Sequence, residues 1–347
     1  MHMKDTKSVK IGNVMCGGSA PVSVQTMYDI PLSSLEPDFD TRMSVLKAMG
    51  CDIIRFSYPD INEHEILCDV VKRCPMPVVA DIHFDWRNAL DAVDCGVAKI
   101  RINPGNIGAR WKTEEIVRKA SDNGTAIRIG LNGGSLPSDE KNRDTASLMV
   151  DTALEYISWF EKLGFYNTVV SLKASDAETS YRAYSMFAKQ SDYPLHLGVT
   201  EAGGTVSSCV RTTYALSGLL DKGIGNTLRY SITGSIEDEV SAGVELLRTM
   251  GLRKGGVRIV SCPTCGRKSF DSRSFLASVQ SELLATGKNI CVAIMGCQVN
   301  GPGEAKGADV AVTGIGNSVF LYRKGEIYRK VSAESAKEEL LKLVSEF

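Results

Sequence analysis

Short apolar runs alternate with amphipathic stretches along most of the chain. The apolar or β-branched runs lie at residues 20–27, 51–57, 76–84, 97–105, 126–132, 167–174, 195–203 and 226–234. Runs of this length and composition, bounded by turn residues, are typical of buried strands in a parallel sheet. The pattern therefore predicts eight such strands before residue 251.

Amphipathic stretches between these runs predict helices, including those at 63–74, 87–95, 114–123, 147–163 and 237–250. A Gly or Pro breaks the helical pattern before each next strand, as helix ends require. Strand and helix alternate at the period of a βα unit, about 30 residues. Eight units predict a closed (β/α)8, or TIM, barrel. A doubly wound open sheet is the alternative, although it usually has fewer strands.

The alternation ends near Gly251, where the segment "GLRKGG" at 251–256 is Gly-rich and basic. Such composition is typical of a joint between domains. Beyond it, strand-like runs, a helix near 274–287 and a charged terminal helix predict a compact α+β module. We therefore predict a TIM barrel over 1–252 and a smaller α+β domain over 253–347.

Composition excludes several classes of function. The 347 residues are 43% hydrophobic and 23% charged, with a formal net charge of -1. A protein that binds nucleic acid or an acidic membrane surface would carry a strong basic excess. No apolar run approaches the roughly 18 residues of a spanning helix, and the polar start has no signal-peptide core. We expect a cytoplasmic protein with no nucleic-acid or membrane partner.

In a TIM barrel the C-terminal ends of the strands face the active site. The residues placed at those ends are Arg55, Asp81, His83, Arg101, Asn103, Arg128, Asn132, Lys173, Glu201, Arg229 and Ser231. Five of them are cations, which repel one another at a common opening and so need an anionic partner. A diphosphate would fit, because Arg binds phosphate oxygens bidentately. Alternatively, some of these cations pair with neighbouring Asp and Glu residues.

Three of these residues could also handle protons or bind substrate hydroxyls. They are Asp81, His83 and Glu201, since carboxylates and imidazoles serve as general acids and bases. A single His near a strand end is more often a hydrogen-bonded structural residue, so His83 alone is weak evidence for catalysis. The other polar residues predicted at the same strand ends strengthen its interpretation as a functional residue.

Ten cysteines occur in a chain without an export signal. This context favours reduced thiols over a disulfide framework. Five cysteines stand singly within apolar patterns and are interpreted as small core residues: Cys51, Cys68, Cys74, Cys95 and Cys209.

Three other cysteines have the spacing C-x2-C-x31-C, namely Cys262, Cys265 and Cys297. Three thiolates fit either zinc or an iron–sulfur cluster. The candidate fourth ligands are Cys291, six positions before Cys297, and Glu304, seven positions after it. Cys291 lies in the continuous apolar run "ICVAIM", where a thiol packs, whereas the turn before Glu304 could return its carboxylate toward Cys297. The pattern favours Glu304.

Several motifs resemble one known family: "CPTCGR", "MGCQVNGPGEA", "ADIHFD", "KIRINPGN", "IRIGLNGGS", "GVTEAG" and "RYSITGS". The family is that of 4-hydroxy-3-methylbut-2-enyl diphosphate synthase of the non-mevalonate isoprenoid pathway, in its two-domain bacterial form. The resemblance implies a TIM barrel followed by a [4Fe-4S] domain. It implies reductive ring opening of 2-C-methyl-D-erythritol 2,4-cyclodiphosphate, with loss of a hydroxyl as water.

The resemblance also implies roles for individual residues. Cys262, Cys265, Cys297 and Glu304 would hold the cluster. Glu201 would approach the hydroxyl-bearing carbons, and the diphosphate would be held by Arg55, Arg101, Arg128 and Lys173. The remaining candidates would line the same pocket: Asp81, His83, Asn103, Asn132, Arg229 and Ser231.

Electrons would come from reduced ferredoxin or flavodoxin, because no G-x-G-x-x-G motif follows a predicted strand. Two other functions are considered: a pterin-binding transferase barrel with a structural zinc tail, and a non-catalytic iron–sulfur electron carrier.

We also expect a homodimer in which the cluster domain of one chain closes the barrel of its partner. The last barrel helix ends at the face opposite the mouth, and the joint of about six residues after it spans at most ~20 Å. This length is too short to bring the cluster domain to the mouth of its own barrel.

Overall fold

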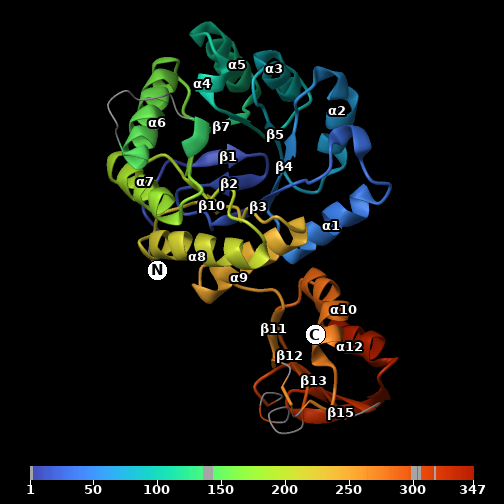
Figure 1. Cartoon of the computed structure of the whole chain (residues 1–347). Helices are drawn as coiled ribbons and strands as arrows, with labels where there is room; N and C mark the ends of the chain where they lie inside the picture. The colour runs from blue at the N-terminus through green and yellow to red at the C-terminus, as the bar shows by residue number, and fades with distance from the viewer. Residues whose placement is uncertain are drawn as a thin grey trace. The chain divides into compact units, whose positions relative to one another are not determined.

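The computed structural model describes residues 3–135, 144–263, 265–266, 268–297, 303, 306–315 and 318–347. The chain divides into two compact units (Figure 1). The first comprises Met1–Lys47 and Cys51–Arg253, and the second comprises Ala48–Gly50 and Lys254–Phe347. Within the described residues, no helix is both long enough and apolar enough to span a bilayer.

Eight parallel strands form the first unit: β3 (Ser23–Met27), β4 (Ile53–Ser57), β5 (Val78–Asp81), β6 (Lys99–Ile102), β7 (Ala126–Asn132), β8 (Thr168–Lys173), β9 (His196–Leu197) and β10 (Thr227–Leu228). Neighbours follow the order of the sequence, and β10 pairs with β3. A parallel bridge between Val170 and Leu195 joins β8 to β9. The predicted TIM barrel is confirmed, and the doubly wound sheet is wrong because its strand order would reverse.

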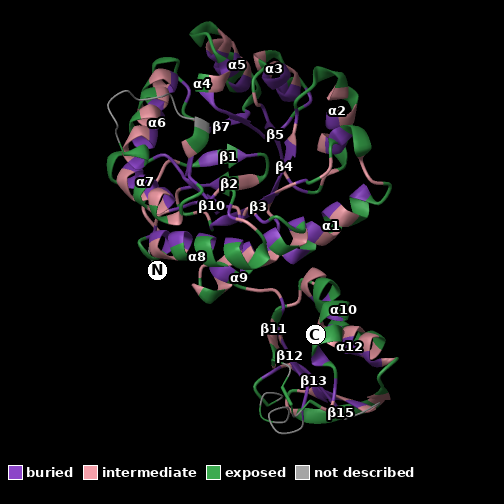
Figure 2. Cartoon of the chain, in the orientation of Figure 1, coloured by how far each residue is buried: buried purple, intermediate pink, exposed green. Residues whose placement is uncertain are grey.

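Helices surround this barrel, as Figure 1 shows: α1 (Phe39–Met49), α2 (His64–Arg73), α3 (Trp86–Asp94), α5 (Arg110–Asn123), α6 (Thr145–Lys162), α7 (Ala177–Gln190), α8 (Thr205–Asp221) and α9 (Ile236–Thr249). Short turns add η1 (Leu32–Ser34), η2 (Ile61–Glu63), α4 (Pro104–Ile107) and η3 (Gly133–Ser135). The strands are largely buried, whereas each helix has a buried and an exposed side (Figure 2).

Side-chain caps fix where the loops after the strands become helices. Asp85, Asp144, Asp176 and Ser235 each accept a hydrogen bond from a backbone N–H in the first turn of α3, α6, α7 and α9. Each cap satisfies a donor that the helix itself leaves unpaired. The loops that carry the candidate site residues are therefore anchored at their helical ends.

An N-terminal hairpin closes the barrel at the end where the strands begin. Its strands β1 (Val9–Ile11) and β2 (Val14–Cys16) pair antiparallel. Val9, Ile11 and Cys16 are fully buried in an apolar cluster with residues from the first positions of the strands, including Ile53 and Ala126. Sequence reasoning missed this hairpin, because each strand has only three residues. Its burial leaves the opposite end of the barrel as the accessible one.

The second unit contains one five-stranded sheet in the order β11 (Arg258–Ser261), β12 (Cys291–Met295), β13 (Val310–Ile315), β14 (Ser318–Arg323) and β15 (Glu326–Ser332). The first three strands are parallel, and the last two pair antiparallel. Helices α10 (Ser272–Ala285) and α12 (Ala336–Ser345) pack with Val292 and Ile294 in one apolar cluster. Ala293 and Met295 belong to a second cluster on the opposite face. The predicted α+β fold of this region is confirmed.

The buried hairpin yields a test of barrel stability. Ile11→Ala should lower the free energy of unfolding by about 2–5 kcal/mol, because it opens a cavity in a fully packed cluster. Met15→Ala is the matched control, since the Met15 side chain in the same hairpin is 45% exposed. Urea denaturation of the two variants measures the difference. Equal losses for Ile11→Ala and Met15→Ala would mean that the hairpin does not pack as a plug.

Candidate active site

A cavity of about 330 Å³ opens at the C-terminal ends of the barrel strands. We call it the mouth pocket. Nine of the predicted mouth residues line it: Arg55, Asp81, His83, Arg101, Arg128, Asn132, Lys173, Arg229 and Ser231. Its size suits a small molecule. The pocket is therefore assembled from strands that are far apart in the sequence but adjacent around the barrel.

Asp81 is the carboxylate shared by several cations of the pocket. Its Oδ1 lies 3.2 Å from Nη1 of Arg101, and its Oδ2 lies 3.8 Å from Nε of Arg55. Nε2 of His83 is also 3.8 Å from Oδ2. Burial alone would raise the pKa of Asp81, but the nearby guanidinium groups of Arg55 and Arg101 lower it to about 2. Asp81 is therefore ionised at neutral pH and offsets one positive charge.

Arg229 is held by a second buried carboxylate, Glu239 of α9. Nε and Nη2 of Arg229 donate to the two oxygens of Glu239 at 2.9 and 2.8 Å. Glu239 is only 2% exposed and also accepts from Thr26 Oγ1 and from the backbone N–H of Ile232. Sequence reasoning missed Glu239, although its position on the buried face of the amphipathic helix was a usable signal. This cation is thus neutralised within the protein.

Arg128 and Lys173 make no ion pair within the described part of the chain. Arg128 is 1% exposed, and Nη1 donates to Ser171 Oγ at 3.2 Å while Nε and Nη2 have no partner there. Burial, followed by the charges of Arg55 and Arg101, lowers the pKa of Arg128 well below its usual value. Burial and Arg128 do the same to the pKa of Lys173.

The pocket consequently has an excess of positive charge. Its lining includes five Arg and Lys side chains, and among the described residues the carboxylates that pair with them are Asp81 and Glu239, so cationic side chains outnumber anionic ones there. A guanidinium does not release its proton in a protein, so the buried charge of Arg128 is unfavourable until an anion approaches. The arrangement is that of an anion-binding site.

Below the pocket, the barrel interior stays polar. Lys99 is fully buried, and its Nζ donates to Oε1 of Gln25 at 3.3 Å. Burial, followed by repulsion from Arg128, lowers the pKa of Lys99 to about 7. His196 is also fully buried, and its pKa is lowered well below the usual value by burial and by Arg128. The positive potential of the mouth therefore extends into the barrel.

Asn103 does not line the mouth pocket. Its side-chain Oδ1 accepts from the backbone N–H of Gly105 at 3.2 Å and so caps the short helix α4. Asn106, three residues later, lines the pocket instead. The sequence pattern thus located a loop of the pocket, and the expectation that Asn103 itself binds substrate stays a prediction.

Glu201 also lies outside the lining of the mouth pocket. It lines a neighbouring cavity of about 480 Å³, which shares Asn132 and Thr200 with the mouth pocket. Its backbone has φ of 54°, in the left-handed region that non-glycine residues seldom adopt. Such conformations persist only where the surrounding structure imposes them, and they are frequent at functional sites.

Two pocket residues that sequence reasoning did not single out contact the cations directly. Met27 Sδ accepts from Nη2 of Arg55 at 2.8 Å and lies 3.8 Å from Nη1 of Arg229. Ser171 is the second, since its hydroxyl accepts from Arg128. The signal for Ser171 was the two-residue period of a strand, because it precedes Lys173 by two positions and so shares its inward face.

In the second unit, Cys262 and Cys297 follow neighbouring parallel strands. Ser261 of β11 pairs with Ile294 of β12, so the two cysteines lie at the same edge of the sheet. The backbone N–H of Gly296 donates to Cys262 Sγ at 3.0 Å. A Cβ on Gly296 would lie 2.8 Å from Ser272 Oγ and 3.3 Å from the carbonyl oxygen of Phe270, so a larger residue there would require its neighbours to shift. An N–H directed at sulfur stabilises a thiolate ligand.

Cys265 is exposed, three residues after Cys262. The sulfurs of Cys262, Cys265 and Cys297 do not form a tight set, because the only three ligand atoms found within 4.8 Å of one another in the described chain belong to His64, Cys68 and Cys95. A single tetrahedral zinc would hold thiolates roughly 3.8 Å apart. In an iron–sulfur cluster each cysteine would bind a different iron.

The two candidate fourth ligands have different outcomes. Glu304 lies outside the described residues. Cys291 is the first residue of β12, and Arg258 Nη2 donates to its sulfur at 3.4 Å. Cys291 is four positions before Met295, the last residue of β12, which corresponds to about 13 Å at ~3.3 Å per residue. Cys291 therefore lies at the far end of the strand from Cys297.

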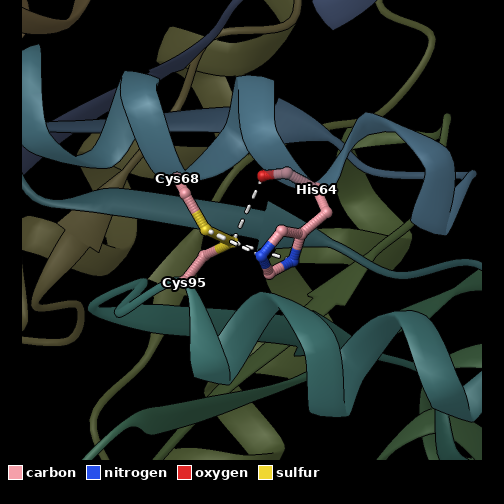
Figure 3. A group of neighbouring side chains, drawn as sticks. All are labelled: His64, Cys68 and Cys95. Carbon is pink, nitrogen blue, oxygen red and sulfur yellow. Dashed lines mark hydrogen bonds between the residues drawn. A yellow bond between two sulfur atoms is a disulfide. The ribbon is translucent and has the colours of Figure 1, made fainter.

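One prediction about the cysteines was wrong. Cys68 and Cys95 form a disulfide between α2 and the end of α3 (Figure 3), rather than standing as separate core thiols. The two residues are 27 positions apart, and their proximity depends on how successive helices pack, which sequence patterns do not reveal. Cys51 is a buried free thiol as predicted, whereas Cys74 and Cys209 are free and only half-buried.

The fold and the pocket define a barrel protein with a cationic pocket at its strand ends, followed by an α+β unit with cysteines at one sheet edge. Two family models match the chain: "GcpE TIM-barrel domain" over residues 6–244 and "GcpE protein C-terminal domain" over residues 258–346. The chain belongs to the GcpE family.

Relatives are similar over nearly the whole chain. A protein of Treponema denticola named 4-hydroxy-3-methylbut-2-en-1-yl diphosphate synthase (flavodoxin) is 43% identical over 354 residues, covering 95% of this chain and 92% of the relative. A protein of the same name from Clostridium perfringens is 41% identical over 347 residues, covering 99% of each chain. The similarity therefore includes both units.

Solved structures of other enzymes share the barrel. Dihydropteroate synthase from Thermus thermophilus matches with a TM-score of 0.53 at 15% identity, covering 71% of this chain and 98% of that one. The enzyme from Xanthomonas albilineans matches with a TM-score of 0.51 at 11% identity, covering 71% of this chain and 97% of that one. At such low identity the likeness shows the fold alone.

The pairing of the pocket cations yields opposite predictions for two matched substitutions. Arg229→Met should lower the free energy of unfolding by about 3–5 kcal/mol, because it leaves the buried carboxylate of Glu239 without its cation. Arg128→Met should leave stability unchanged or raise it, because it removes a buried charge that has no ion-pair partner in the described chain. Urea denaturation compares the two. A larger loss for Arg128→Met than for Arg229→Met would contradict the charge assignment.

Proposed function

We propose that this protein catalyses the reductive ring opening of 2-C-methyl-D-erythritol 2,4-cyclodiphosphate to 4-hydroxy-3-methylbut-2-enyl diphosphate. The observation that carries the proposal is the uncompensated positive charge of the mouth pocket, in a chain whose near full-length relatives are named for making this diphosphate. A cyclic diphosphate supplies the negative charge that the pocket lacks.

Arg55, Arg101, Arg128 and Lys173 would hold the diphosphate. Arg128 has unpaired N–H donors, and Lys173 has no ion-pair partner in the described chain, so both gain most from an incoming anion. Each charge-assisted hydrogen bond contributes about 1.5–3 kcal/mol. The pair of Arg55 and Arg101 is already oriented by Asp81, which reduces the rotamer freedom lost on binding. Asn132, His83, Arg229 and Ser231 would complete the lining.

Glu201 is the candidate catalytic residue. Its cavity adjoins the mouth pocket through Asn132 and Thr200, and its strained backbone holds the carboxylate at this position. There it would hold a substrate hydroxyl and offset positive charge that develops at carbon as the ring C–O bond breaks. Asp81 and His83, whose side chains are 3.8 Å apart in the mouth pocket, would orient the diphosphate.

Cys262, Cys265, Cys297 and Glu304 would hold a [4Fe-4S] cluster, which supplies the two electrons of the reaction one at a time. The shared sheet edge and the N–H bond to Cys262 support this ligand set, and the position of Cys291 at the far end of β12 supports leaving it out. We propose reduced flavodoxin or ferredoxin as the donor, since the names of the relatives specify flavodoxin. We propose a cytoplasmic enzyme, because the cluster ligands must stay reduced thiolates.

Anaerobic purification with iron and sulfide analysis, followed by turnover of the cyclodiphosphate, tests the proposal. We expect four irons per chain in the wild type, full iron and activity in Cys291→Ser, and loss of both in Cys297→Ser. The two variants are matched because both replace a sulfur near β12 with oxygen. Zinc in place of iron would favour the pterin-binding transferase. Iron without substrate turnover would favour a simple electron carrier.

We further propose that the active site is shared between two chains. α9 is the last helix of the barrel and runs antiparallel to the strands, so it ends on the face opposite the mouth pocket. Residues 250–257 connect it to β11, a joint that spans at most ~27 Å when fully extended. A two-fold partner would bring a cluster to the pocket without requiring that joint to cross the barrel wall.

Mixing two inactive variants tests the shared site. Glu201→Ala removes the candidate catalytic carboxylate, and Cys297→Ser removes a proposed cluster ligand. Subunit exchange between them should restore activity, because half of the sites in a heterodimer would pair an intact barrel with an intact cluster domain. The control is a mixture of Glu201→Ala with Lys173→Ala, two barrel variants that cannot complement each other. Verified exchange with no recovery of activity would exclude the shared site.

A further inference from the structure

A second sulfur site lies in the wall of the barrel unit, separate from the proposed cluster ligands. Cys68 on α2 and Cys95, which directly follows α3, form a disulfide beside the imidazole of His64 (Figure 3). Cys68 Sγ is 3.5 Å from Nε2 of His64, and Cys95 Sγ is 3.5 Å from Nδ1 of the same ring. The ring therefore faces both sulfurs.

Asp91 of α3 orients this imidazole. Its Oδ1 lies 2.9 Å from Nδ1 of His64, and its Oδ2 accepts a hydrogen bond from the hydroxyl of Tyr58. A carboxylate that accepts the Nδ1 proton leaves the lone pair on Nε2, which is the nitrogen nearest Cys68. His64 is thereby positioned to take a proton from the Cys68 thiol once the disulfide is opened.

Accessibility distinguishes the two sulfurs. Cys68 is half-buried and the side chain of His64 is 45% exposed, whereas Cys95 is only 9% exposed. A reagent from solvent therefore reaches Cys68 first. A buried disulfide far from any titratable group would be inert. In this one, the single imidazole of His64 lies beside both sulfurs, and Cys68 is accessible to solvent.

The rest of the cysteines make this bond unusual within the chain. None of the other eight cysteines, including the three proposed cluster ligands, takes part in a disulfide within the described residues. In proteins whose thiols are kept reduced, an isolated disulfide is usually transient and takes part in redox chemistry. The pairing thus points to a bond that opens and closes rather than to a permanent crosslink.

We propose that Cys68 and Cys95 form a reversible dithiol–disulfide site that exchanges with an external dithiol, with His64 as its proton acceptor and donor. This site is a two-electron redox centre distinct from the iron–sulfur module. Its substrate class is a dithiol, either a small molecule or a Cys-x-x-Cys protein.

In the reducing direction, one thiol of the external dithiol releases its proton to water, and its thiolate attacks Cys68 Sγ. This step forms a mixed disulfide and breaks the bond to Cys95, whose sulfur leaves as a thiolate and takes up a proton from water. The second thiol of the reagent then gives its proton to His64 and attacks the reagent sulfur of the mixed disulfide. This attack closes the reagent's disulfide and releases Cys68 as a thiolate paired with protonated His64. The reagent is oxidised by two electrons to its disulfide, and the protein pair is reduced by two electrons.

Thiol mapping on the full-length holoenzyme tests the proposal. The protein is prepared anaerobically so that the cluster survives, oxidised with glutathione disulfide, and then treated under native conditions with dithiothreitol. Alkylation followed by peptide mass analysis reads the state of Cys68 and Cys95. We expect a closed pair after oxidation and two alkylated thiols after dithiothreitol. Repeating the reduction with a Cys-x-x-Cys oxidoreductase at equal thiol concentration identifies the preferred source of the dithiol by its faster rate.

The role of His64 is tested by the rate of native reduction. His64→Ala should slow it by at least about tenfold, since positioned proton transfer contributes factors of this size or more. His64→Gln should also be slow, because its amide can contact Asp91 but cannot transfer the proton. This second variant guards against a folding defect in His64→Ala. Glu65→Ala, at a neighbouring position of α2, is the matched control and should react at the wild-type rate.

Three results would overturn the proposal. Cys68 and Cys95 that stay fully alkylated after glutathione disulfide would mean that no disulfide forms. A disulfide that native dithiothreitol never opens would be a fixed structural crosslink. Stoichiometric zinc on the reduced protein that requires Cys68 and blocks reoxidation would make the group a metal site instead.

Discussion

The mouth of the barrel carries positive charge that the described part of the protein neutralises only in part. Arg128 and Lys173 are buried without an ion pair in the described chain, and among the same described residues the carboxylates that pair with cations of the mouth pocket are Asp81 and Glu239. A buried charge of this kind opposes folding. The strand ladder and the apolar hairpin at the other end of the barrel must therefore supply stability that the mouth does not. Binding of an anion would remove the conflict, so the same charges that destabilise the empty pocket favour its ligand.

The interior of the barrel is graded from apolar to cationic. The hairpin and the first residues of the strands form an apolar layer at one end. Lys99 is the first residue of β6 and pairs in register with Val79 and Ala126 of that layer, and its pKa is lowered to about 7. Arg128 lies two residues after Ala126 along β7, toward the mouth. Because the lowered pKa of Lys99 reflects burial and repulsion from Arg128, part of the interior charge responds to pH near neutrality, whereas the guanidinium groups do not. Sites that trade stability for function in this way are common in enzymes.

Sequence reasoning succeeded where one local rule decided the outcome. A residue at the C-terminal end of a barrel strand lies at the mouth. This rule alone was enough to place Arg55, Asp81, Arg101 and Lys173. It failed where the outcome depended on packing between elements. Glu239 reaches Arg229 from a helix, and Asn103 caps α4 while Asn106 faces the pocket. The Cys68–Cys95 bond depends on two helices that only the folded barrel brings together.

The two sulfur sites differ in the chemistry that their surroundings allow. At the edge of the second sheet, a backbone N–H from Gly296 donates to Cys262 Sγ, at a position where a Cβ would be crowded by Ser272. Such an environment stabilises thiolate ligands and suits a cluster that moves single electrons. In the barrel wall, an imidazole held by Asp91 lies against a sulfur pair, which suits proton-coupled transfer of two electrons at once. Because the reaction proposed for the mouth pocket consumes single electrons in sequence, only the first kind of site can serve it directly. The sulfur pair in the wall therefore belongs to a different electron exchange, one between this protein and the thiols around it.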